Sequence, residues 1–239
     1  TGAVFASGTQ LFYQPQSFKR KWPGSLGMSQ ISAEKVEYYY PNKMGRIVLV
    51  AMEEIMGHHG VNAVLNLAKL SHLVNNYPPN NLQLGFTFSE FSAIQQTLDD
   101  MYGERGGRGL ALRAGRETWK YALKEFMPVL GITDLAMRML PLGIKIKIGL
   151  DVFAETFNKF SDQRVRLGED AENYLWVIER CPICWQRVSD TPCCHLAIGL
   201  LEQALDWVSR GRRFKVEQIS CIATGDETCT IAIAKQPLV

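Results

Sequence analysis

The cysteine distribution is the feature of this 239-residue sequence that most limits how the chain can fold. All six cysteines lie between Cys181 and Cys229. An even number of cysteines would suit disulfides in a secreted protein, but the first residues lack the basic-then-apolar layout of a signal peptide. We therefore expect a cytoplasmic protein with reduced thiols, which act as metal ligands or as small buried apolar groups.

Two adjacent cysteine pairs favour metal binding. Cys181 and Cys184 form a CxxC pair directly after a predicted strand, where a turn can direct both sulfurs to one side, as in zinc knuckles. Cys193 and Cys194 follow Thr191, which is predicted to cap a helix with proline at its first position. The free N–H groups at such a helix start stabilise thiolate, the form of cysteine that binds metal.

The last two cysteines, Cys221 and Cys229, lie at the facing ends of two predicted antiparallel strands, which would bring their side chains together. A tetrahedral zinc ion needs four ligands, and the chain offers six thiols. We take Cys193 as the expected bystander and leave His195 out as helix surface. The candidate metal ligands are Cys181, Cys184, Cys194, Cys221 and Cys229. An iron–sulfur cluster is the alternative cofactor. A further alternative is that the cysteines are buried apolar residues that bind no metal.

Hydrophobic periodicity predicts an α+β fold. Residues 1–44 lack a clear period and are predicted to form an N-terminal extension, and residues 45–239 are predicted to form one domain. Helical spacing covers residues 47–56, 61–68, 88–101, 112–126 and 196–208, with Ser89 as a plausible N-cap. Hairpin patterns cover residues 165–178 and 214–234.

Two segments are less regular. Gly103, Gly106, Gly107 and Gly109 are expected to interrupt the helical pattern. Residues 132–160 favour a helix that starts or kinks at Pro141, although three isoleucines there alternate with lysines as a strand would: Ile144, Ile146 and Ile148.

Composition narrows the function classes. A formal net charge of +2 indicates no nucleic-acid partner, and no run of apolar residues approaches the roughly 20 needed for a membrane span. No glycine-rich dinucleotide motif follows a predicted strand, which argues against independent reductase chemistry. A thioredoxin-like role for the CxxC pair is also disfavoured, because Cys184 does not lead into a helix.

The segment from Cys194 to Ile233 resembles the end of the V4R domain, named after 4-vinyl reductase and related to TRAPP vesicle-tethering subunits and to phenol-sensor domains. The matching residues are Cys194, Gly199, Val216, Glu217, Cys221, Gly225, Asp226 and Cys229. The stretches 102–104 and 114–116 look like the family's long-helix region, so the resemblance covers roughly residues 45 to 235.

The resemblance implies helices packed on an antiparallel sheet, V4R/TRAPP-like, around a pocket for a small hydrophobic molecule, and it implies a homodimer. In the phenol sensors the cysteines resemble a structural zinc site completed by a glutamate three residues before the first hairpin cysteine. That position is Gln218 here, and a neutral amide is a poor zinc ligand. Cys181 or Cys184 would then supply the fourth zinc ligand in place of that glutamate, and we favour Cys184.

The function expected from these features is a metal-stabilised binding or sensor domain for a hydrophobic ligand, with affinity and without turnover. The alternatives are a protein of tetrapyrrole (bacteriochlorophyll) metabolism of the 4-vinyl reductase type, or an assembly or scaffold protein. The ligand-binding residues are not identified. Large apolar residues that would suit a pocket, or only fill the core, are Trp119, Phe126, Met127, Met137, Met139, Phe153 and Phe157.

Overall fold

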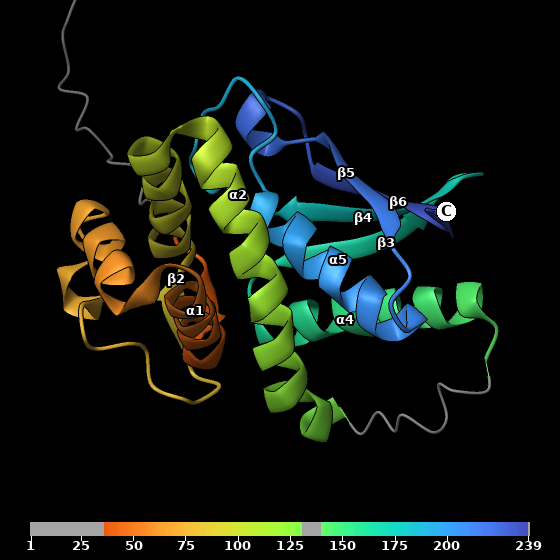
Figure 1. Cartoon of the computed structure of the whole chain (residues 1–239), viewed down its shortest axis with the longest axis horizontal. Coiled ribbons are helices and arrows are strands. Elements are labelled where there is room, and N and C mark those ends of the chain that lie inside the picture. Colours follow the sequence, from red (N-terminus) through yellow and green to blue (C-terminus); the bar gives the residue numbers. More distant parts are fainter. Residues whose placement is uncertain (1–35, 131–139, 239) are drawn as a thin grey trace, which may run out of the picture. The chain divides into compact units, whose positions relative to one another are not determined.

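A computed structural model of the chain describes residues 36–130 and 140–238. The described elements are β1 (Tyr39–Pro41), α1 (Asn42–Leu67), β2 (Leu84–Thr87), α2 (Phe88–Leu130), α4 (Leu142–Phe160), β3 (Arg164–Glu169), β4 (Asn173–Arg180), α5 (His195–Ser209), β5 (Phe214–Ser220) and β6 (Cys229–Pro237), with short 3-10 turns at Ser71–Leu73 and Ile222–Thr224 (Figure 1). The predicted α+β class, with helices packed on an antiparallel sheet, is confirmed.

The main sheet has four antiparallel strands in the order β3-β4-β6-β5. Both predicted hairpins are confirmed: β3 pairs with β4, and β5 pairs with β6. Strand β6 also pairs with β4, which places Ile178 opposite Cys229 and joins the hairpins into one sheet. Strands β1 and β2 form a separate two-stranded sheet. The pairing of β4 with β6 therefore brings the CxxC segment beside the start of the last strand.

Helix α5 lies along the four-stranded sheet, and α2 packs on α5 (Figure 1). Two glycines allow this close contact. A Cβ at Gly115 in α2 would collide with the carbonyl oxygen of Leu196, and a Cβ at Gly199 in α5 would collide with the carbonyl oxygen of Leu112. The two helix backbones thus approach each other more closely than any larger residue would permit.

Glycine also marks the two helix kinks. Gly57 interrupts α1 with φ 73° and Gly103 interrupts α2 with φ 70°, a backbone region that side chains disfavour. The predicted break after residue 56 is confirmed. The prediction that Gly106, Gly107 and Gly109 interrupt the chain was wrong, because all three continue α2 as helix. Gly107 is small for a packing reason, since a Cβ there would lie 2.8 Å from the Cα of Asp99.

Two predicted N-caps were wrong. Thr87, rather than Ser89, caps α2: the Glu90 N–H donates to Thr87 Oγ1 at 3.0 Å, and the Thr87 N–H donates to a Glu90 carboxylate oxygen at 2.7 Å. This is a capping box displaced by two residues from the expected position. Helix α5 begins at His195, so Thr191 does not cap it; its hydroxyl donates instead to Glu104 at 3.0 Å.

The helix predicted to start at Pro141 is confirmed from Leu142 onward, and the strand alternative for Ile144 to Ile148 was wrong. Ile146, Leu150 and Ala154 are buried at four-residue spacing, as one face of a helix requires, whereas Ile144 and Ile148 are exposed. Residues 132–139 of the predicted helical stretch lie outside the described residues.

The compact unit that contains the described residues runs from Val36 to Val239. The division into an extension of residues 1–44 and a domain of residues 45–239 stays a prediction. None of the described helices combines the length and the apolar character needed to cross a membrane.

Candidate metal centre and ligand cavity

Four buried cysteine sulfurs form a compact group. The Sγ–Sγ distances are 3.6 Å for Cys181 and Cys194, 3.3 Å for Cys184 and Cys229, and 3.7 Å for Cys194 and Cys229. All four sulfurs lie within 4.8 Å of one another. A tetrahedral zinc ion with Zn–S bonds of about 2.3 Å separates its sulfurs by about 3.8 Å. The group, which we call the cysteine quartet, therefore has the dimensions to hold a metal ion.

The remaining two cysteines adjoin the quartet. The sulfur of Cys221 lies 3.9 Å from those of Cys194 and Cys229. Cys193, Cys194 and Cys221 form a second group with sulfurs within 4.8 Å of one another. The structure thus brings all five predicted ligands together, and it also places the expected bystander Cys193 in the cluster. Their assignment as metal ligands stays a prediction.

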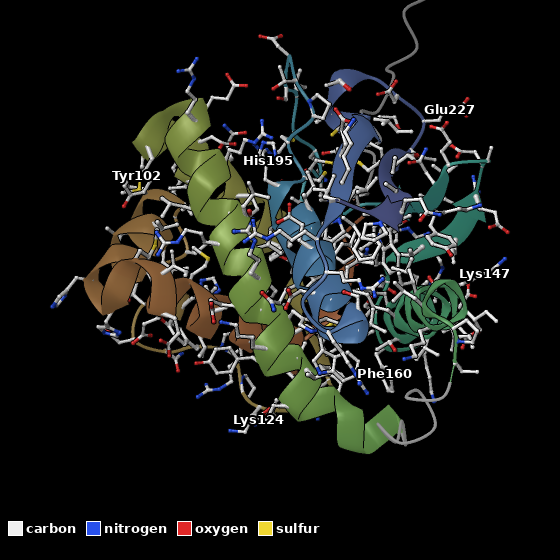
Figure 2. All side chains as sticks on the ribbon, turned by 45° about the vertical axis from the view of Figure 1, so that its right-hand side comes forward. Tyr102, Lys124, Lys147, Phe160, His195 and Glu227 are labelled. Carbon is white, nitrogen blue, oxygen red and sulfur yellow. The ribbon has the colours of Figure 1, made fainter. Side chains whose placement is uncertain are left out.

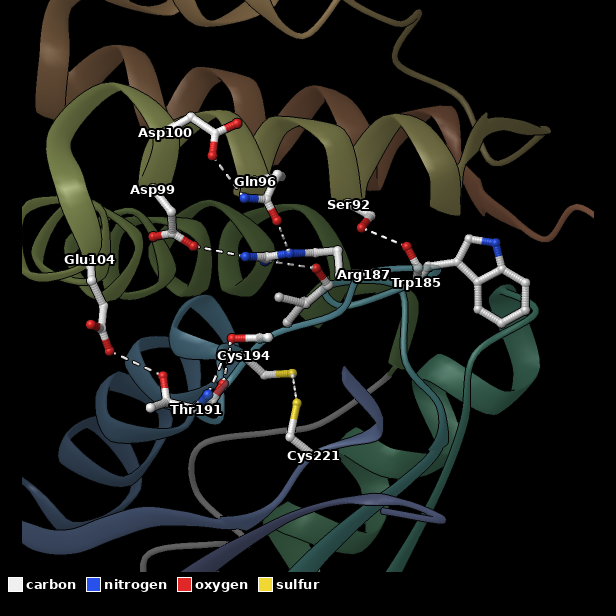
Figure 3. Close-up of polar contacts among 12 residues, drawn as sticks. Ser92, Gln96, Asp99, Asp100, Glu104, Trp185, Arg187, Thr191, Cys194 and Cys221 are labelled. Atoms are coloured by element: carbon white, nitrogen blue, oxygen red, sulfur yellow. Dashed lines mark hydrogen bonds and ion pairs between the residues drawn. The ribbon is translucent and has the colours of Figure 1, made fainter. Parts of the chain in front are cut away.

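Polar contacts to α2 hold the segment between β4 and α5 that carries four of the cysteines. The Arg187 guanidinium donates to Asp99 at 2.7 Å and to Gln96 at 2.9 Å, and only 6% of its side chain is exposed (Figure 3). The Ser92 hydroxyl donates to the Trp185 carbonyl at 2.7 Å. This segment contains no helix or strand and so lacks their regular backbone hydrogen bonds. The side-chain hydrogen bonds to α2 fix its position instead.

Side chains from the β5–β6 hairpin orient the backbone at the cysteines. The Gln218 amide oxygen accepts a hydrogen bond from the Cys194 N–H at 3.0 Å, and its NH₂ donates to the Ser220 carbonyl at 3.0 Å. Asp226 accepts from the Cys221 N–H at 2.8 Å. The position that holds a glutamate ligand in the phenol sensors therefore serves here to position Cys194, which suits an amide with both a donor and an acceptor.

Charge within the cluster is unevenly distributed. Hydrogen bonds from the thiols of Cys184, Cys193 and Cys194 hold the pKa of Cys221 far below its ordinary value. Hydrogen bonding to Cys181 and other neighbouring sulfurs raises the pKa of Cys194 well above its ordinary value. Burial would raise the pKa of Cys181, but hydrogen bonds from the thiols of Cys184, Cys194 and Cys229 hold this pKa well below its ordinary value. The thiolates of Cys181 and Cys221 are thus stabilised by adjacent S–H donors, and a bound cation would stabilise several.

His195 stands at the start of α5, beside α2 (Figure 2). Burial lowers the pKa of its imidazole, which favours the neutral form. Its Nδ1 atom is buried and has no hydrogen-bond partner among the described residues. The prediction that His195 is ordinary helix surface does not account for this buried nitrogen.

A largely apolar cavity of about 150 Å³ lies between the helices and the sheet. Its walls come from α1, α2, α4 and α5 and from strands β1 and β4. Of the large residues singled out in the sequence, Trp119, Phe126, Phe153 and Phe157 line it. The side chains of Met127, Met137 and Met139 lie outside the described residues.

Two residues that line the cavity, Thr118 and Trp119, each carry a buried polar atom with no hydrogen-bond partner among the described residues, namely Oγ1 and Nε1. Two other polar groups of the wall are paired: the Tyr40 hydroxyl donates to Gln163, and the Thr156 hydroxyl donates to the Val152 carbonyl at 2.7 Å. Burial raises the pKa of Tyr40 well above its ordinary value, so its hydroxyl stays neutral. A buried donor without a partner is costly unless a bound molecule satisfies it.

The cavity and the cysteine cluster share one chain segment. Ile183, between Cys181 and Cys184, lines the cavity, and so do Leu196 and Ala197, which follow Cys194 closely in the chain. Sequence reasoning missed Ile183 and Thr118, because neither residue type carries a signal without knowledge of its neighbours. The position of the cysteines thus shapes one wall of the cavity.

Comparison with known proteins places these sites in context. The family model of the V4R domain matches residues 176–235, a segment that contains all six cysteines, so the resemblance is confirmed there. No curated protein sequence matches the chain.

Solved H-NOX structures share the fold. A doubly substituted Tt H-NOX aligns with TM-score 0.54 and 12% identity, over 83% of this chain and 97% of its own. An unliganded Fe(II) H-NOX from K. algicida has TM-score 0.54 and 14% identity, over 82% and 96%. An S. oneidensis H-NOX in the Fe(II)NO ligation state has TM-score 0.52 and 14% identity, over 81% and 98%.

Proposed function

We propose that this chain is a binding or sensor domain for a small apolar molecule that carries one hydrogen-bonding group. The observation that carries the proposal is the apolar cavity lined by Thr118 and Trp119, whose Oγ1 and Nε1 atoms are buried and unpaired among the described residues. Ligand sites of this kind are mostly apolar, with a few convergent polar groups that orient the ligand. The V4R match and the shared H-NOX fold support a small-molecule binding role.

The similar structures include H-NOX proteins studied for distortion of haem, so the fit of haem to this cavity needs a test. Haem iron takes an axial His, Cys, Met or Tyr. No histidine or cysteine lines the cavity within the described residues, and its Tyr40 hydroxyl is already bound to Gln163. Met44 lines the cavity, but methionine serves as an axial ligand opposite a histidine. Drug-sized ligands occupy roughly 300–1,000 Å³, well above the volume found here. Haem therefore does not fit, and the size also argues against the tetrapyrrole alternative.

A compact aromatic molecule fits the volume better. A cavity of comparable size, created in another protein's core by truncating a leucine, binds benzene. The aromatic wall formed by Trp119, Phe153 and Trp176, with Trp119 and Phe153 in an edge contact at 5.1 Å, offers favourable ring contacts. A hydroxyl on the ligand would satisfy the unpaired atoms of Thr118 and Trp119.

The metal part of the proposal assigns zinc to the cysteine quartet, with an iron–sulfur cluster as the alternative. The ion would pin the CxxC segment, the start of α5 and the start of β6 together, and would thereby hold Ile183 at the cavity wall. A homodimer, a cytoplasmic location and binding without turnover remain expectations.

Paired titrations with toluene and p-cresol, followed by calorimetry, test the ligand class. The two probes share a ring and differ by a hydroxyl. We expect p-cresol to bind about fivefold more tightly, because one hydrogen bond contributes about 1 kcal/mol. Thr118→Val should remove most of this difference, and Ala204→Phe, which fills the cavity, should weaken both probes.

Thr230→Val is the matched control, since Thr230 is also a buried threonine but does not line the cavity. It should leave both affinities unchanged. Failure of either probe to bind the wild-type protein, or equal binding to Ala204→Phe and wild type, would contradict the proposed cavity function.

A further inference from the structure

We propose that the exposed face of α2 is a docking surface for an acidic helix of a partner protein. Six basic residues lie on this face after the Gly103 kink, and all six are exposed: Arg105, Arg108, Arg113, Arg116, Lys120 and Lys124. We call them the basic stripe. Neither the cavity nor the cysteine cluster uses this surface, so the inference does not depend on the proposed ligand or metal.

Helix geometry places the six side chains on one side of α2. Each residue of a helix advances by about 100°, so the six positions fall within an arc of about 160°. Ala111, Ala114 and Thr118 are buried on the opposite side. From Arg105 to Lys124, which marks the far end in Figure 2, the stripe is about 29 Å long at a rise of 1.5 Å per residue. The stripe is therefore long enough to lie along several turns of a second helix.

Part of the stripe lacks counter-charges within the described protein. Arg116 pairs with Glu202 at 2.7 Å. Lys120 pairs with Glu117, also at 2.7 Å. The three arginines nearest the kink form no ion pair and no side-chain hydrogen bond with any residue that the structure describes, and we call them the arginine triad: Arg105, Arg108 and Arg113. The triad is thus the part of the stripe that is free to bind carboxylates of a partner.

Gly109 lies at the centre of the arginine triad on the helix surface. Its φ is not positive, and nothing lies within 4 Å of an added Cβ, so neither backbone conformation nor packing within the described protein requires glycine there. Glycine inside a helix costs about 1 kcal/mol relative to alanine. Gly115 and Gly199 show what such a residue permits, since they allow the backbones of α2 and α5 to approach closely. Gly109 offers the same close approach to a helix from outside.

The chemistry of the stripe favours an acidic helix over other polyanions. Guanidinium groups bind carboxylates through paired hydrogen bonds, and carboxylates three or four residues apart on a helix are about 6 Å apart along one face. A phosphate backbone would also meet the carboxylates of Glu117 and Glu202 beside the stripe. Helices that lie on membranes insert large apolar side chains, and beyond the kink the described part of α2 exposes none.

The same helix also contacts both candidate sites. Thr118 and Trp119 line the cavity, and Asp99 and Gln96 hold the cysteine segment through Arg187. A partner docked on the basic stripe would therefore bind the element that the cavity and the cysteine cluster share.

Calorimetry with a synthetic peptide tests the proposal on the full-length chain. The probe is an alanine-based helical peptide of about 20 residues with glutamates three and four residues apart along one face, and the reference peptide has glutamine at these positions. The wild type should bind the glutamate peptide at least about tenfold more tightly at low salt. Replacement of the whole arginine triad by glutamine should weaken this binding about tenfold, because three ion pairs are lost.

Gly109→Leu tests the close approach separately from charge. Leucine keeps the net charge and favours the helix, so the variant should fold like the wild type. Its side chain would hold the two helices apart, and the glutamate peptide should bind at least about fivefold more weakly. This variant also keeps the proposal testable if the triad variant does not fold.

A triple variant with the same loss of charge on other surfaces is the matched control. It combines Lys147→Gln, Arg166→Gln and Lys215→Gln, whose side chains are 50%, 60% and 66% exposed on α4, β3 and β5. It should bind the glutamate peptide within about twofold of the wild type, because screening limits the effect of distant charges.

Contrary results would overturn the proposal in different ways. No binding of the glutamate peptide to the wild type, or equal binding to the wild type and the triad variant, refutes the docking surface. Unchanged affinity in Gly109→Leu refutes a closely packed helical partner. Tighter binding of a short DNA duplex or of phosphatidylserine vesicles than of the peptide would replace the acidic helix by that polyanion. None of these results bears on the cavity or the quartet.

Discussion

The cysteine cluster and the apolar cavity differ in how their parts are assembled. The cluster joins the end of β4, the start of α5 and the β5–β6 hairpin through six side chains of one chemical type. The cavity is a space left between apolar side chains of several helices and the sheet. The stability of the cluster therefore depends on a few residues, whereas the packing around the cavity depends on many. Single substitutions should have larger effects in the cluster than at the cavity.

The largest expected effect is at the cluster. Cys229→Ser should abolish metal binding at the quartet and prevent cooperative folding, because structural zinc contributes on the order of 10 kcal/mol, comparable to the whole stability of a domain. Zinc counting and thermal melting followed by circular dichroism check this. A variant with full zinc content and unchanged melting would break the contrast between the two regions.

The contact between α2 and α5 should come next. Gly199→Ala places a Cβ against the carbonyl of Leu112 and should lower the free energy of unfolding by about 1–3 kcal/mol through overpacking. Gly109→Ala is the control, because nothing lies within 4 Å of its added Cβ, and it should be neutral or stabilise by up to about 1 kcal/mol. Urea unfolding measures both, and equal values would contradict the close helix approach.

Support of the cysteine segment should show an intermediate effect. Asp99→Ala removes the partner of the buried Arg187 and should cost about 1–3 kcal/mol, with easier zinc loss to a chelator. Arg166→Gln breaks the exposed pair with Glu179, where Arg166 is 60% exposed, and should cost about 0–1 kcal/mol. Comparable losses in both variants would mean that α2 does not support the metal centre.

The smallest effect should occur at the cavity. Thr118→Val removes an unpaired buried hydroxyl, so the free energy of unfolding should stay within about 1 kcal/mol of the wild type or rise slightly. Thermal melting without ligand measures this change. A loss well above that size would show that the hydroxyl already has a partner within the protein, and it would remove the argument for a polar group on the ligand.

The sequence predicted the cluster better than the cavity, for a physical reason. Cysteine is rare enough that six within 49 positions carry information by themselves, and the CxxC spacing is set by the geometry of one turn. The helix starts were harder: Thr87 and Thr191 are both good caps by type, but only the neighbouring Glu90 makes Thr87 one. A helix N-cap depends on which hydrogen-bond partner lies near the residue, and the residue type alone does not indicate that partner.

The sequence by itself determined the α+β class, the confinement of the thiols to the last quarter of the chain and the pairing of the two hairpins, because these depend on local periodicity and turns. Only the tertiary structure decided that Cys193 joins the cluster, that Gln218 positions Cys194, and that Thr118 lines a cavity with its hydroxyl unpaired among the described residues. Each of these depends on contact between segments far apart in the chain, and such contacts are set by packing of the whole fold rather than by any local pattern.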